Sequence, residues 1–177
     1  MTSSDETEFD AAAAEVLRPH VGTWIDEAGG GAGRRVAIAA ARFNGGITLR
    51  LLAGALAGLD EAGVAAADVT VAWAPGAFEL PLVARTLATS PARVDAVIAL
   101  GAVIRGETGH YDFVAGECAR GLQTVQLETG VPVVFGVLTT EDVAQALDRS
   151  RTDASNKGRE AALTAVEMAA VVRRIRR

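Results

Sequence analysis

The sequence predicts an α/β fold in which helices cover both faces of a four-stranded parallel sheet. Three observations carry this prediction. Apolar runs typical of strands alternate four times with segments of helical periodicity. Each connection is long enough for a helical crossover, which parallel neighbours require. The run Val94–Leu100 is apolar at almost every position, as in strands that are buried on both faces.

The first half of the predicted domain contains two strand–helix units. Val36–Ala41 is an unbroken apolar run and is therefore predicted to be a strand. From Ile47 apolar residues recur at helical spacing until Gly63 closes the helix. Asp68–Trp73 alternates between polar and apolar residues, which indicates a less buried strand. A second helix then runs to about Ala88.

The second half repeats this order. After the strand Val94–Leu100, a helix is predicted over Val114–Glu128. Pro132–Leu138 is the fourth strand, and Thr139–Asp142 caps a helix with an acidic first turn that suits the helix dipole. A polar loop leads to the final helix, Lys157 to about Ile175, which ends among arginines that complement the negative helix end.

Residues 1–33 are predicted to be a flexible N-terminal extension, and residues 34–177 a single domain. The alanine-rich stretch Phe9–Leu17 favours a short helix, which Pro19 ends. The glycines of Gly29–Gly33 indicate a flexible joint before the domain.

Composition excludes several classes of function. The net charge of −5 argues against non-specific binding of nucleic acid. No apolar run approaches the roughly 20 residues of a membrane span, and the acidic start MTSSDETEFD does not resemble a targeting signal. We therefore expect a cytoplasmic protein without membrane or nucleic-acid partners. The single cysteine, Cys118, is expected to be a packed residue, and no histidine or carboxylate cluster predicts a metal site.

In a parallel sheet the turns after the strands meet at one edge, where ligands bind. We expect four turns there: Arg42–Gly46, Pro75–Glu79, Gly101–His110 and Gly136–Thr140.

The third turn is the most informative. Gly101–Thr108 nearly matches the nucleoside-triphosphate loop, but Glu107 stands at the lysine position and would repel a polyphosphate. The backbone amides of Glu107 and Thr108, with the Thr108 hydroxyl, could still hold a single phosphate at the start of a helix. A glycine turn without a ligand is the alternative. His110 follows directly and is placed either for proton transfer or for a structural role.

Several other side chains have two possible roles each. Phe43 and Phe78 could stack on a flat ring or fill the core, and Glu79 could accept hydrogen bonds from a polyol or a ring nitrogen. Arg149 could clamp a phosphate or be solvated. Lys157 is the only lysine in the chain, which reflects either compositional chance or a functional role.

Together these stretches resemble the lumazine synthase family closely. The resemblance spans Arg35 to about Arg173. It rests on RFN (Arg42–Asn44), PGAFELP (Pro75–Pro81), GAVIRGETGHYDFV (Gly101–Val114), GVPVVFGVLTTE (Gly130–Glu141), LDR (Leu147–Arg149) and NKG (Asn156–Gly158).

The resemblance implies a flavodoxin-like three-layer α/β/α sandwich and a transferase of riboflavin biosynthesis without a cofactor. The implied reaction condenses 5-amino-6-(D-ribitylamino)uracil with 3,4-dihydroxy-2-butanone 4-phosphate to 6,7-dimethyl-8-ribityllumazine, phosphate and water. The family's catalytic roles fall on His110, for proton transfer, and Arg149, which holds the phosphate. The implied substrate-binding residues are Phe43, Ala77, Phe78, Glu79, Ala102, Val103, Ile104, Glu107, Thr108, Phe135, Arg149 and Lys157.

The resemblance also implies an assembly. Phe135, Arg149 and Lys157 would come from the neighbouring subunit of a homopentamer. Some members build an icosahedral capsid of twelve pentamers, and the short loop before Lys157 favours that form. Riboflavin synthase is then an expected partner. The sequence departs from the family at Ala102, where threonine is common, and at Arg151 and Asp153.

Two rival functions stay open at this point. One is a riboflavin synthase of the archaeal type, which would use the same scaffold to join two lumazines. The other is a non-catalytic flavin- or lumazine-binding carrier or shell protein.

Overall fold

The structure is a computed structural model that describes residues 11–23, 25 and 30–177. The expected N-terminal helix is present as α1 (Ala11–Leu17), followed by a single 3-10 turn, η1 (Arg18–His20). Phe9 and the rest of residues 1–10, with residues 24 and 26–29 of the expected extension, lie outside the described residues. From Gly31 the chain packs against the domain: Gly31 is buried, and its backbone N–H donates to the Ala62 carbonyl at 2.6 Å.

A parallel sheet of four strands confirms the predicted fold class. The strands lie in the order β2-β1-β3-β4, with all neighbours parallel. Their bounds are β1 (Val36–Ala41), β2 (Val69–Ala74), β3 (Ala96–Ile104) and β4 (Val133–Thr140). Every residue of β1 is buried, and four of its six residues are alanines that let helices approach from both faces. The strand β2 is an edge with exposed positions, as its alternating sequence predicts.

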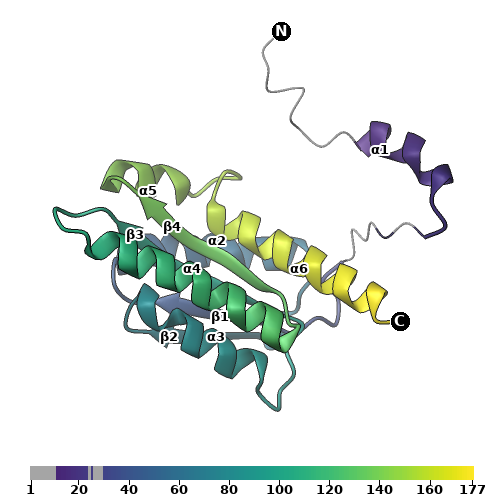
Figure 1. Ribbon diagram of the computed structural model, residues 1–177, viewed down its shortest axis with the longest axis horizontal. Coiled ribbons are helices and arrows are strands. Elements are labelled where there is room, and N and C mark those ends of the chain that lie inside the picture. Colours follow the sequence, from purple (N-terminus) through teal and green to yellow (C-terminus); the bar gives the residue numbers. More distant parts are fainter. Residues whose placement is uncertain (1–10, 24, 26–29) are drawn as a thin grey trace, which may run out of the picture.

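Helices cover both faces of this sheet, as expected for a flavodoxin-like sandwich (Figure 1). On one face α2 (Gly45–Glu61) and α6 (Lys157–Ile175) bury Leu51, Leu59 and Val166 against Ile38 and Ile98. On the other face α3 (Leu80–Ala88) and α4 (His110–Thr129) bury Leu80, Leu122 and Cys118 against Ala37, Ala39 and Val97. The remaining elements are η2 (Ala66–Asp68), η3 (Ala77–Glu79) and α5 (Val143–Arg149).

Cys118 is a packed core residue, as expected. Its side chain is fully buried, and desolvation raises the pKa of the thiol to about 12. None of the helices among the described residues is both long enough and apolar enough to cross a bilayer.

The helices α2 and α6 touch at backbone distance. A Cβ placed on Gly158 would lie 1.9 Å from the Leu51 carbonyl oxygen, so only glycine fits there. Just before it, the buried side chain of Asn156 accepts a hydrogen bond from the Gly158 backbone N–H at 2.8 Å and caps α6. Its Nδ2 donates to the carbonyl oxygens of Arg50 and Arg151 at 3.2 and 2.6 Å. One amide side chain therefore fixes the start of α6.

Several predicted boundaries were wrong at the carboxyl ends of the strands. Gly101–Ile104 belongs to β3 and not to a turn, and Gly136–Thr140 belongs to β4. The reason is that these two segments pair with each other, from Gly101 opposite Val137 to Ile104 opposite Thr140. Asp142 alone therefore caps α5, by accepting from the Gln145 backbone N–H. The helix α4 begins at His110, four residues before the predicted start at Val114.

Candidate active site

A cavity of about 640 Å³ opens at the carboxyl ends of β1, β2 and β3. It is lined by Phe43, Asn44, Pro75, Gly76, Ala77, Phe78, Glu79, Ala102, Val103, Ile104, Gly106, Thr108, His110, Tyr111, Phe113 and Val114. This is the edge at which parallel sheets bind ligands. Its volume lies in the range of small-molecule sites.

The turn after β1 presents an aromatic ring to the cavity. The backbone N–H groups of Arg42 and Phe43 donate to the carbonyls of Ala74 and Pro75 at 2.9 and 3.0 Å, which ties the turn to the end of β2. Phe43 is 72% exposed, so it is not a core residue. Asn44 takes the left-handed conformation (φ 56°), and its Nδ2 donates to the Ala102 carbonyl at 2.9 Å. That bond fixes the turn against β3.

The turn after β2 forms the opposite wall. Ala77 is buried, whereas Phe78 is 57% exposed and lines the cavity. The Glu79 carboxylate lies close over Gly76, because a Cβ on that glycine would come within 3.2 Å of Oε2. The glycine therefore leaves room for an acceptor beside the ring of Phe78.

The strand β3 and the loop after it close the cavity. Ala102, Val103 and Ile104 line it from the strand, and Gly106, Thr108 and His110 line it from the loop and the first residue of α4. The Thr108 hydroxyl accepts from the His110 backbone N–H at 3.4 Å. Glu107 is exposed and is not among the lining residues.

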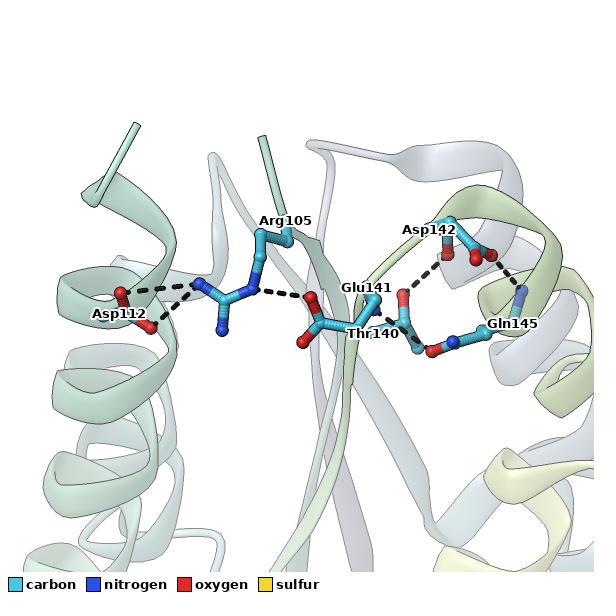
Figure 2. A network of polar contacts seen from close by, with 6 residues as sticks. All are labelled: Arg105, Asp112, Thr140, Glu141, Asp142 and Gln145. Carbon is cyan, nitrogen blue, oxygen red and sulfur yellow. Dashed lines mark hydrogen bonds and ion pairs between the residues drawn. The ribbon is translucent and has the colours of Figure 1, made fainter. Parts of the chain in front are cut away.

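Arg105 joins the end of β3 to its surroundings (Figure 2). Its Nε donates to Glu141 at 2.7 Å and its Nη1 to Asp112 at 3.2 Å. The guanidinium lies over the Tyr111 ring, 4.0 Å from the centroid, in a cation–π contact. Desolvation lowers the pKa of Arg105, but the hydrogen bonds to Glu141 and Asp112 outweigh it, so the pKa is raised overall.

Three predicted site residues lie elsewhere. Phe135, Arg149 and Lys157 line a second hollow of about 410 Å³ between β4 and α6. The hollow is bounded by α6 and the cavity by α4, and these helices cover opposite faces of the sheet.

The three predicted site residues in this hollow have accessible side chains. Phe135 is 43% exposed. Arg149 is exposed and donates to its own helix, at the Gln145 carbonyl. Lys157 pairs with Glu160 one turn further along α6. A single chain therefore does not bring these three residues to the cavity.

Sequence reasoning missed part of the lining. Tyr111 and Phe113 line the cavity from the first turn of α4, and Asn44 does so from the turn after β1. A signal for Phe113 was present, because it lies three residues after His110 and therefore on the same face of a helix. The links of Arg105 to Glu141 and Asp112 had no such signal, because β4 and α4 meet only in the fold.

The lining shows which chemistry the cavity can support. Phe43, Phe78 and Phe113 offer apolar surface for a flat ring, and Glu79 and the imidazole of His110 offer polar contacts. Among the described residues, neither arginine nor lysine lines the cavity, and no group of three metal-binding side chains was found. An anion here would be held by backbone amides and by the positive end of α4.

A known protein family matches most of this chain. The model of the family described as 6,7-dimethyl-8-ribityllumazine synthase matches residues 33–173. The matched region contains all the cavity residues and also Phe135, Arg149 and Lys157 of the hollow.

Proposed function

The chain belongs to the 6,7-dimethyl-8-ribityllumazine synthase family, a family of transferases in riboflavin biosynthesis, and on that premise we propose the reaction of this chain. It condenses 5-amino-6-(D-ribitylamino)uracil with 3,4-dihydroxy-2-butanone 4-phosphate. The products are 6,7-dimethyl-8-ribityllumazine, phosphate and water. The observation that carries the proposal is the cavity itself, in which aromatic side chains, a helix start and an imidazole meet.

The uracil ring binds in the apolar part of the cavity. Phe43 stacks on the pyrimidine, and its high exposure leaves one face of the ring free to do so. Backbone groups of Ala102, Val103 and Ile104 face the pyrimidine edge. The ribityl hydroxyls donate to Glu79, which lies beside Phe78 at the cavity wall.

The phosphate of the second substrate binds at the start of α4. The backbone amides of Glu107 and Thr108 donate to its oxygens, and the helix dipole favours its negative charge. His110, the first residue of α4, lies beside this seat in the cavity lining. Its imidazole moves the protons that the reaction requires.

The steps need no cofactor. The substrate amine attacks the ketone carbon, and loss of water leaves a Schiff base. The C–O bond to phosphate then breaks, and the departing oxyanion is stabilised by the amides and by a cation. Ring closure completes the product. Holding two substrates together supplies much of the acceleration.

The cation comes from a second chain. Arg149, with Phe135 and Lys157, lies in the hollow beside β4, away from the cavity of its own chain. A neighbouring copy that places its hollow against the cavity adds the missing positive charge and a further ring. This head-to-tail contact closes into a homopentamer, or into a capsid of twelve pentamers. A capsid could enclose riboflavin synthase as a partner.

The direct test mixes the protein with both substrates and follows absorbance of the lumazine together with release of phosphate. The proposed reaction produces both signals. Consumption of added lumazine without phosphate release would instead indicate a riboflavin synthase of the archaeal type. Binding of lumazine without either signal would indicate a carrier or shell protein.

A second test addresses the shared site. A chain carrying His110→Ala and a chain carrying Arg149→Ala are refolded together in equal amounts. If every site takes its cavity and its hollow from two chains, about one quarter of the sites regain both wild-type residues. Mixed assemblies that are no more active than the two variants apart would contradict the shared site.

A further inference from the structure

Arg105 connects the loop that borders the cavity to two neighbouring parts of the fold, the end of β4 and the first turn of α4. Its backbone belongs to the loop after β3, and its N–H donates to the Thr140 carbonyl at the end of β4. Its guanidinium reaches Glu141 after β4 and Asp112 in the first turn of α4, as Figure 2 shows.

The loop that Arg105 begins has little packing of its own. It runs from Arg105 to Gly109 and carries Thr108 to the phosphate seat. A Cβ added at Gly106 or at Gly109 would meet no atom within 4 Å. Glycines in open space leave the backbone many conformations. Something other than packing must therefore hold the loop and the start of α4 in one place.

The contacts of Arg105 supply that restraint. Tyr111 and Asp112 follow His110 in the first turn of α4, and Tyr111 also lines the cavity. The guanidinium holds Asp112 by hydrogen bonds and Tyr111 by its ring face. On its other side it is anchored to Glu141, whose backbone N–H donates to Gln145 of α5 at 3.1 Å.

Direct contact with substrate is not the role of this arginine. Arg105 is not among the cavity-lining residues, although its neighbours Ile104 and Gly106 are. Its guanidinium is also already paired with the carboxylates of Asp112 and Glu141.

From this arrangement we propose that Arg105 is a positioning residue, which fixes the first turn of α4 so that the Thr108 seat and His110 face the phosphate-bearing substrate. The role rests on the proposed function. It predicts that loss of Arg105 affects the butanone phosphate more than the uracil, which binds mainly to the turns after β1 and β2.

The test compares Arg105→Gln with Arg105→Lys. In the glutamine variant, the KM for the butanone phosphate rises about tenfold or more, kcat falls, and the KM for the uracil stays near the wild-type value. The lysine variant keeps a cation between Asp112 and Glu141 and recovers much of the loss. The matched control is Arg85→Gln, which removes an exposed arginine that pairs with Glu128 at the far end of α4. It leaves both KM values unchanged.

Hydrogen exchange gives a readout that does not depend on turnover. In Arg105→Gln, peptides that cover residues 105–116 exchange faster than in the wild type, whereas those that cover the end of α4 do not. If Arg105→Gln does not fold, Glu141→Gln removes the anchor and retains the arginine, with the same expected pattern.

Two results would overturn the positioning role. One is unchanged exchange at residues 105–116, and the other is a loss shared equally by the two substrates. A wild-type protein that forms no lumazine would instead remove the proposed function, and the exchange comparison alone would then decide whether Arg105 fixes α4.

Discussion

The cavity and the hollow beside β4 divide the chemistry between them. The cavity has three phenylalanines, the start of a helix and one imidazole, whereas the hollow has one phenylalanine with Arg149 and Lys157. Each region lacks one charged or titratable group that the other holds. Among the described residues, the cavity has no side-chain cation in its lining, and the hollow has no imidazole. On this comparison rests our proposal that each surface is incomplete in one chain and that the two form one site between chains.

The largest effect is expected when the hollow loses its charge. Arg149→Ala should lower kcat/KM by about 10³-fold, because a fixed cation no longer stabilises the departing phosphate. Arg151→Ala, two residues further on and paired with Asp148, is the matched control and should leave steady-state kinetics unchanged. Equal losses in the two variants would mean that the general charge of this surface matters and not Arg149.

Removal of the imidazole should have the next largest effect on the cavity. His110→Ala should lower kcat by about 10²-fold, since proton transfer is lost but the substrates are still held together. Binding of a ring analogue, measured by calorimetry, should keep its affinity. Wild-type turnover in this variant would assign the proton transfer to another group.

The helix start beside the hollow is held by one buried side-chain amide, that of Asn156, which does not line the cavity. Asn156→Ala should destabilise the protein by about 2–3 kcal/mol, from the lost helix cap and two lost hydrogen bonds. Urea unfolding measures the loss. Asn156→Asp keeps the cap acceptor and removes the donors, so its loss should be smaller. An aspartate variant as unstable as the alanine variant would make the donors, and not the cap, the main contribution.

The aromatic wall of the cavity can be tested alone. Phe43→Ala should raise the KM for the uracil about tenfold through lost stacking and leave the KM for the butanone phosphate near its wild-type value. Leu127→Ala, an equally exposed apolar residue at the far end of α4, serves as the control. Equal changes in both KM values would contradict a stacking role.

The smallest effect concerns pH and the loop beside the hollow. Hydrogen bonds from the Ser155 side chain and backbone lower the pKa of Asp153. A carboxyl whose pKa is lowered by folding stabilises the protein above its ordinary value of 3.8, and this contribution is lost as the pH falls through the folded value. Asp153→Asn should therefore show slightly less loss of stability than the wild type between about pH 5 and pH 2. Parallel pH profiles for the two proteins would contradict it.

The order of elements could be predicted from the sequence because local periodicity determines it. The strand ends could not, since β3 and β4 extend each other by pairing from Gly101 to Ile104, and no local pattern encodes a partner. Phe43 and Phe78 were placed in turns correctly, but their exposure is visible only in the fold. The separation of Arg149 and Lys157 from the cavity followed from the family resemblance and not from spacing. The proposed role of Arg105 rests on the meeting of this loop and α4 with the end of β4, where Glu141 lies 36 residues further along the chain.

The contact at Gly158 has a consequence for engineering. A library that randomises α6 in search of new assemblies should return only glycine at this position, because the Leu51 carbonyl occupies the space of any side chain. Substitutions on the solvent-exposed surface of the same helix meet no such steric constraint. Designers who wish to alter the hollow are therefore free to vary Thr164, whereas Gly158 must stay as it is.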